Sequence, residues 1–148
     1  MTHIYAHRNA VPKTMRALAK VAPGPGVKLI EALVPTPGPG EVLIRVKKTA
    51  LSTAALHTDR WDAWAQRTIS PPVILGHEFV GLVACVGPGV TDCHPGELVI
   101  GEPCVACGNC RHCLGGHRHL CPDAHRLGQD RDGAFADYVC LPQSAVWH

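Results

Sequence analysis

The 148-residue sequence has few aromatic side chains, no long apolar run and no excess of charge of one sign. Aromatic residues make up 5% of it, and the formal net charge is +2, with lysine and arginine scattered along the chain. Without a basic cluster, neither nucleic acid nor an anionic membrane surface is expected as a partner. No apolar stretch approaches the roughly 18 residues of a membrane-spanning helix, because Phe79–Val86 ends at Gly87 and Pro88.

The N-terminal residues 1–14 lack both the apolar segment and the small-residue cleavage site of a secretory signal. We therefore expect a cytoplasmic protein in which residues 1–14 form a flexible extension. In a reducing compartment, the eight cysteines are better explained by metal ligation, catalysis or free thiols than by a disulfide framework.

Glycine and proline interrupt the sequence often, with 15 and 13 copies, which favours short strands and turns over long helices. One or two short helices are expected at residues 53–66. In Glu41–Thr49, alternation predicts a half-buried strand whose second face, with Leu43, Arg45 and Lys47, is exposed to solvent. The expected strands are 15–21, 27–34, 41–49, 79–86, 98–100 and 134–141. Such a pattern predicts one mainly β domain over residues 15–148, a closed or partly closed β-barrel with short helices.

Four cysteines give the strongest chemical pattern in the chain. Cys107, Cys110, Cys113 and Cys121 form C-x2-C-x2-C-x7-C within a polar, glycine-containing segment. Two intervening residues let a tight turn aim successive thiolates at one point, and four thiolates complete a closed tetrahedral zinc shell. The spacing predicts one structural zinc per chain, held in a small lobe at residues 104–122 whose folding depends on the metal.

Other uses of these thiols stay open at this point. A run of this kind also resembles iron–sulfur ligation, although the ferredoxin pattern places three residues, not seven, before the last cysteine. The four could also be surface thiols, and Cys104 could compete as a ligand. Cys85, Cys93 and Cys140 have the character of small apolar residues.

Three motifs coincide in order and spacing with one known family. They are the cysteine loop, the corner Gly76-His77-Glu78, and the segment from Gly133 to Tyr138, which reads GAFADY. On these motifs, the sequence from Met15 onward resembles the N-terminal, GroES-like catalytic domain of the zinc-containing medium-chain alcohol dehydrogenases. The stretch from Trp61 to Thr68 is most similar to the threonine dehydrogenase branch of that family.

The resemblance implies a second, catalytic zinc besides the structural one, with His77 and Glu78 at the positions of its ligand and of the acidic residue that follows. It gives His57 the position of the family's proton-relay histidine. In the family, the zinc acts as a Lewis acid on the substrate alcohol, and the hydride passes to NAD held by a separate Rossmann domain. No G-x-G-x-x-G turn occurs in the 148 residues, so a Rossmann domain is expected to be absent and no NAD-binding residue is assigned.

Two departures from the family pattern lie beside His57. Ser52 stands where the family has a zinc-binding cysteine, and Ala54 stands where it has a relay threonine. A serine hydroxyl is a poor zinc ligand at neutral pH, and alanine carries no transferable proton. An alternative is therefore that His77 and Glu78 are a buried polar pair satisfied by backbone, and that His57 is an exposed helical histidine.

These observations lead to one main functional hypothesis and two rivals. We expect the zinc-binding catalytic portion of a threonine dehydrogenase-like, NAD-dependent oxidoreductase, incomplete and inactive as a lone chain. One rival is a non-catalytic binding or assembly module that forms a homo-oligomer or pairs with a full-length homologue or a separate Rossmann domain. The other is a truncated gene product without a function of its own.

Overall fold

The computed structural model describes residues 11–148. Residues 1–10 of the expected flexible extension lie outside this range, and β1 begins at Thr14. The strands are β1 (Thr14–Lys20), β2 (Lys28–Leu33), β3 (Glu41–Thr49), β4 (Val73–Ile74), β5 (Phe79–Val86), β6 (Leu98–Gly101), β7 (Cys104–Val105), β8 (His125–Arg126), β9 (Tyr138–Pro142) and β10 (Val146–Trp147). The helices are α1 (Thr53–Arg60), α2 (Ala63–Thr68) and α3 (Arg111–Leu114), with short 3-10 turns η1 (Arg118–Leu120) and η2 (Gln143–Ala145). None of these helices is long and apolar enough to cross a membrane.

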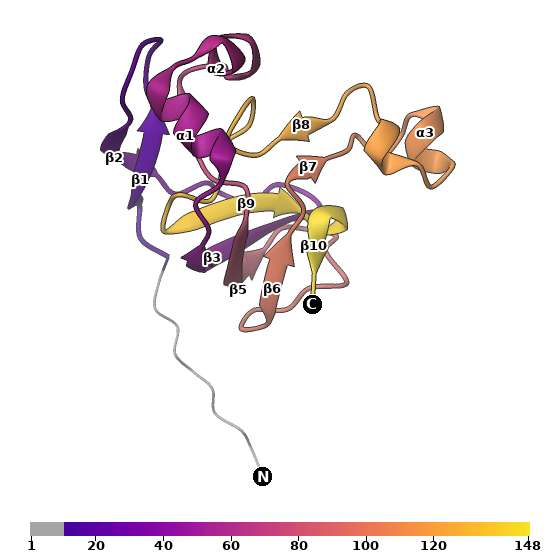
Figure 1. The fold of residues 1–148 in the computed structure, drawn as a ribbon. Coiled ribbons are helices and arrows are strands. Elements are labelled where there is room, and N and C mark those ends of the chain that lie inside the picture. The colour runs from indigo at the N-terminus through magenta and orange to yellow at the C-terminus, as the bar shows by residue number, and fades with distance from the viewer. Residues whose placement is uncertain (1–10) are drawn as a thin grey trace.

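The strands form two main antiparallel sheets that curl toward each other (Figure 1). One sheet has the order β2-β1-β4 and the other the order β10-β6-β5-β3-β9. An antiparallel bridge between Ala17 and Ala136, with the Leu18 N–H donating to the Phe135 carbonyl at 2.8 Å, joins them along β1. The expectation of a mainly β, partly closed barrel with short helices is confirmed.

The apolar core fills both faces of β3. Val42 and Ile44 pack with Val139 and Leu141 on the inner face. Leu43, which the alternation placed on a solvent-exposed face, is instead buried in a second cluster with residues of β1 and β4. That prediction is wrong because the three-stranded sheet covers this end of β3, and only at Lys47 and beyond does the strand emerge into solvent.

The strand expected at residues 134–141 begins only at Tyr138. The preceding residues form hydrogen bonds with other segments: the Phe135 N–H donates to the Leu75 carbonyl and the Asp137 N–H to the Arg16 carbonyl. The one or two short helices expected at residues 53–66 are two, α1 and α2, separated at Trp61, which has a left-handed φ of 56°. The Asp62 carboxylate then accepts the first free N–H groups of α2.

The cysteines outside the lobe behave as ordinary core or near-core residues. Cys93 is buried in the main apolar cluster, and Cys85 and Cys140 are half-buried beside the second one. All eight cysteines of the chain are free thiols in this structure.

Candidate metal centre and the His77 corner

The cysteine lobe, residues 104–122, extends from the barrel on a short two-stranded stem (Figure 1). β7 and β8 pair through two residues each, with Cys104 opposite Arg126. Between the two strands the chain makes α3 and η1. Because Cys104 belongs to the stem, it is held apart from the four cysteines that meet at the far end.

The four thiols predicted to bind zinc converge on one point. The Sγ atoms of Cys107, Cys110, Cys113 and Cys121 all lie within 4.8 Å of one another. Three of the separations are 3.5 Å (Cys110 to Cys113), 3.9 Å (Cys107 to Cys113) and 3.9 Å (Cys110 to Cys121). A tetrahedron of sulfurs about 2.3 Å from a central zinc has an edge of about 3.8 Å. The four residues therefore fit a single tetrahedral ion, and a multi-iron cluster, which would hold its thiolates further apart, fits less well.

The protonation of the thiols shows why a cation suits the site. Backbone N–H groups of Asn109 and Cys110 lower the pKa of Cys107 to about 7, whereas loss of solvent contact raises the pKa of Cys113 to about 12. The Cys107 N–H itself donates to the Cys121 sulfur at 3.4 Å. One thiolate is thus stabilised by the backbone, but four cannot coexist at neutral pH unless a cation balances them.

Apolar burial contributes little to the lobe. Between residues 106 and 124 only Ala106 and Cys121 are buried, and the two leucines of α3 and η1, Leu114 and Leu120, are exposed. The lobe therefore lacks a hydrophobic core of its own, so a metal bound by the four thiolates would supply the free energy that holds it together.

The second candidate site is the His77 corner, where β4 leads into β5 beside the start of α1. A small pocket there is lined by Ser52, Ala54, Ala55, Thr58, Leu75, Gly76, His77, Gly128 and Gln129. The structure thus brings His77 together with Ser52 and Ala54, the two positions that depart from the family pattern. Ser52 is the N-cap residue of α1, but its side chain makes no capping hydrogen bond.

Glycines allow the chain to pass closely at this corner. Gly76 has a φ of +92°, and a Cβ on it would lie 2.2 Å from the Phe135 ring. A Cβ on Gly133 would lie 2.0 Å from the Gly76 carbonyl oxygen, and one on Gly128 would lie 2.7 Å from the Gly76 nitrogen. Backbone therefore packs on backbone around His77, which fixes where its side chain starts.

Glu78 and His57 lie at the edge of this site or outside it. The Glu78 carboxylate is 3.5 Å from His77 Nε2. The backbone carbonyl of Glu78 accepts hydrogen bonds from the Ala50 N–H and the Thr49 hydroxyl. Glu78 does not line the pocket. His57 also stays outside the pocket lining: its Nδ1 bonds to the Asp62 carboxylate.

The pairing with Asp62 was not expected from sequence. Its hydrogen bond to His57, followed by those from the N–H groups of Ala65 and Trp64, lowers the pKa of the Asp62 carboxyl. The carboxylate thus caps α2 and orients the imidazole at the same time. An aspartate directly before a helix, five residues after a histidine, is the pattern that could have revealed it.

The two sites differ in their donor sets. Within residues 11–148 the four cysteines are the one group of three or more histidine, cysteine or carboxylate donors that converge closely enough for a metal ion. At the corner, His77 and Glu78 supply two donors, and the adjacent Ser52 offers only a hydroxyl. A catalytic zinc there stays a prediction.

The fold and the cysteine lobe match a known domain. Residues 38–148 match the family model described as the alcohol dehydrogenase GroES-like domain. The chain belongs to this family.

Within the family, the chain is similar to enzymes named L-threonine 3-dehydrogenase. The L-threonine 3-dehydrogenases of Saccharopolyspora erythraea and Stenotrophomonas maltophilia are 46% and 48% identical over 133 residues, 90% of this chain and 39% of each relative. The chain thus spans about two fifths of the length of these curated relatives.

Solved structures agree with this placement. A crystal structure of an NAD-dependent alcohol dehydrogenase superposes with a TM-score of 0.80 at 35% identity, covering 90% of this chain and 39% of that one. A cobalt- and zinc-bound thermostable alcohol dehydrogenase from Pyrobaculum aerophilum gives a TM-score of 0.77 at 35% identity, covering 90% and 40%.

Proposed function

We propose that this chain is the zinc-binding catalytic-domain portion of an L-threonine 3-dehydrogenase-like, NAD-dependent oxidoreductase, and that it does not oxidise alcohols by itself. The observation that carries the proposal is the 46–48% identity to L-threonine 3-dehydrogenases across 133 residues. The free thiols suit a reducing compartment, and the proposal places the chain in the cytoplasm.

Zinc would be held by Cys107, Cys110, Cys113 and Cys121 and would act there structurally, since four thiolates leave no open coordination position for a substrate. The cobalt- and zinc-bound alcohol dehydrogenase from Pyrobaculum aerophilum supports the choice of metal.

The proposed catalytic residues are His77, Glu78 and His57, at or beside the corner. Together they do not form a complete set of zinc ligands. If a zinc were bound at His77, it would polarise an alcohol oxygen as a Lewis acid. Asp62 holds His57 Nδ1, which leaves Nε2 to exchange a proton with solvent or substrate. Ala54 cannot pass that proton on, and the 148 residues contain no phosphate-binding glycine turn for NAD.

Elemental analysis tests the metal assignment. The purified chain is expected to hold one zinc, which Cys110→Ser abolishes and the matched stem variant Cys104→Ser retains. Two zincs, one of them lost in His77→Ala, would instead show that the corner binds metal despite Ser52. Iron with visible absorbance would overturn the zinc assignment.

Activity tests the rest of the proposal. The chain alone, supplied with L-threonine and NAD, is expected to produce no NADH above a no-enzyme control. Sustained turnover that a zinc chelator stops would contradict the proposed inactivity. Ser52→Cys is expected to raise the zinc content toward two per chain, because a thiolate replaces the hydroxyl beside His77.

A binding or assembly role is a second candidate, favoured by one surface. Leu98, Ile100 and Trp147 are exposed large apolar residues, and Ile100 lies directly opposite Trp147 in the β6–β10 ladder. Such a patch is typical of a protein interface, in a homo-oligomer or against a full-length homologue or separate Rossmann domain. Light scattering on the chain and on Trp147→Ser tests this: a monomer in both cases would speak against self-association.

A further inference from the structure

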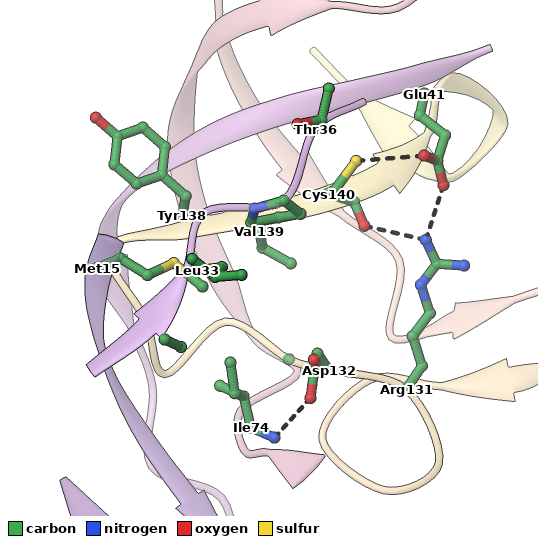
Figure 2. A pocket seen from close by; sticks show the side chains of 13 residues that line it. Met15, Leu33, Thr36, Glu41, Ile74, Arg131, Asp132, Tyr138, Val139 and Cys140 are labelled. Carbon is green, nitrogen blue, oxygen red and sulfur yellow. Dashed lines mark hydrogen bonds and ion pairs between the residues drawn. The ribbon is translucent and has the colours of Figure 1, made fainter. Parts of the chain in front are cut away.

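The charged side chains of the groove between β9, β1 and the segment after β2 bind one another or the backbone (Figure 2). Arg131 Nη2 donates to Glu41 Oε1 at 3.1 Å, and Asp132 Oδ1 accepts from the Ile74 N–H at 2.8 Å. Lys20, at the end of β1, lies in a different setting. It is 1% exposed, and no carboxylate of residues 11–148 lies within ion-pair distance of it. Such an enclosed charge is unusual, since a buried ammonium is normally paired.

The Lys20 ammonium lies at the C-terminal end of α1. Its Nζ donates to the carbonyls of Gly24 and Gly26, the latter at 2.7 Å, and is 4.8 Å from the centre of the Trp61 ring. Trp61 is the C-cap residue of α1, and the Gly26 N–H donates at 2.6 Å to the Asp59 carbonyl in the last turn of that helix. A helix C-terminus and the face of an indole ring both favour a cation. Lys20 therefore connects the β1–β2 hairpin to this helix end (Figure 1).

The backbone of Trp61 decides where the next residue lies. Its φ of 56° is left-handed, a conformation that is strained for a residue with a Cβ. The contact of the ring with Lys20, and a hydrogen bond of 2.9 Å from Gln66 Nε2 to the Trp61 carbonyl, hold it there. Because the chain turns at Trp61, α1 ends and Asp62 becomes the N-cap residue of α2.

Asp62 uses its two carboxylate oxygens for different partners. Oδ1 accepts from the Trp64 N–H at 3.0 Å and the Ala65 N–H at 3.1 Å, and Oδ2 accepts from His57 Nδ1. Since an ionised carboxylate only accepts, Nδ1 carries the proton, and Nε2 of the neutral ring keeps a free lone pair. The His57 and Asp62 side chains are 39% and 37% exposed, so water competes for this bond. The bond therefore depends on how firmly Asp62 is held.

We propose that Lys20 is a positioning residue for His57. Through the Trp61 ring it fixes the left-handed turn between α1 and α2, so that Asp62 holds His57 with the proton on Nδ1 and the lone pair on Nε2. That form of the ring is the one that can accept a proton from a substrate hydroxyl at Nε2. The inference rests on the proposed role of His57 in proton transfer, and it adds a residue of β1 that does not line the pocket at the His77 corner.

Long-range ¹H–¹⁵N NMR of the ¹⁵N-labelled chain tests this, because it reports which imidazole nitrogen carries the proton. The His57 signals are identified by their absence in His57→Gln, at about pH 8.5, where an ordinary histidine is neutral. The wild type is expected to hold His57 in the Nδ1–H form. Lys20→Met removes the ammonium and keeps an unbranched side chain. In this variant the ratio of the Nδ1–H form to the Nε2–H form is expected to fall about ten-fold.

Variants of the intervening residues test the route from Lys20 to His57. Asp62→Ser keeps a helix N-cap but has no second oxygen for His57, so its ratio marks the complete loss of the bond. Trp61→Leu removes the aromatic face and is expected to give most of the change seen in Lys20→Met. Trp61→Phe keeps a face for the ammonium and is expected to stay within about two-fold of the wild type.

A matched control separates positioning from a general loss of stability. Leu141→Ala destabilises the barrel core, which lies outside this set of contacts, and is expected to leave the His57 ratio unchanged. Amide signals of β3 and β5 show whether each variant is folded. Should Lys20→Met not fold, Trp61→Leu gives the same test, because it leaves the ammonium with its two carbonyl partners.

Three results would overturn the proposal. They are a wild-type His57 ratio in both Lys20→Met and Trp61→Leu, an equal fall of the ratio in Leu141→Ala, and a wild-type chain that already holds His57 in the Nε2–H form. Zinc content and turnover do not enter this test. A failure of the proposed function, which those two measurements show, is therefore distinct from a failure of the positioning role.

Discussion

The barrel and the cysteine lobe are held together in different ways. In the barrel, apolar side chains from two sheets fill a core that includes both faces of β3. In the lobe, two residues are buried between 106 and 124, and four thiols converge instead. We therefore expect the barrel to be stabilised by removing apolar surface from water and the lobe by a metal bound to the four thiols.

Mutations and metal removal should therefore act differently in the two regions. We expect the stability of the barrel to depend on the volume of its buried side chains and not to change when a chelator is added. We expect the stability of the lobe to depend on bound metal and not on its exposed leucines.

Metal removal should give the largest effect, confined to one region. A strong zinc chelator at pH 7 is expected to unfold the lobe, because zinc binding by such thiolate sets is worth on the order of 10 kcal/mol. Hydrogen exchange measured by mass spectrometry should rise to unfolded-chain rates at residues 106–121 and stay slow in β3 and β5. Adding zinc should restore protection. Equal loss of protection in β3 and β5 would mean that the two regions are not independent.

A core truncation should affect the barrel. Leu141 is 0% exposed in the main apolar cluster, and Leu141→Ala removes buried methyl groups and leaves a cavity, so it is expected to cost about 3 kcal/mol of unfolding free energy. Urea unfolding followed by tryptophan fluorescence measures it. The zinc content of this variant should equal that of the wild type. A loss of zinc in the variant would show that the lobe depends on the barrel core.

Acid should weaken the barrel through Glu41. The Gly38 N–H and then Arg131 hold the pKa of this carboxyl below its usual range, against the effect of burial. Because the folded-state pKa is depressed, the stabilisation is present above the unfolded pKa of about 4.3 and is lost as pH falls through the folded value. Glu41→Gln is expected to cost about 1 kcal/mol at pH 7 and to flatten the acid limb of stability. An acid limb as steep as that of the wild type would contradict this role.

Truncating a leucine in the lobe should have almost no effect. Leu114 is 76% exposed on α3, so Leu114→Ala is expected to change stability by less than about 0.5 kcal/mol and to leave zinc content unchanged. The same chemical change thus gives a large effect at Leu141 and almost none here. A cost above 1 kcal/mol in the same urea assay would show that apolar contacts support the lobe after all.

Much of the barrel could be predicted from local pattern. Glu41–Thr49 and Phe79–Val86 were expected with the bounds that the structure shows. Alternation marks the first and an apolar run the second, and Gly40 precedes one strand and Gly87 follows the other. The convergence of the four thiols also follows from spacing alone. These features depend on residues close together in the sequence.

What could not be predicted depends on distant contacts. Leu43 is buried because a second sheet covers it. The two-residue strands β7, β8 and β10 are too short to show a period. Lys20 is buried with its ammonium over the Trp61 ring and donating to the Gly26 carbonyl at 2.7 Å, an arrangement that joins residues about 40 positions apart. No local pattern indicates that a lysine near the end of a strand will be enclosed in this way.

The close backbone packing at the His77 corner has a consequence for how the site can change. Because a Cβ at Gly76 or Gly133 would clash with neighbouring atoms, we expect a single substitution at either position to disrupt the corner. Ser52 and Ala54, by contrast, lie on the wall of the pocket formed by α1 and its N-cap residue. Substitutions at these two positions can therefore change the donors that face His77 and leave the glycine contacts in place. A thiol at position 52 would then enter a pocket whose opposite wall is fixed by backbone.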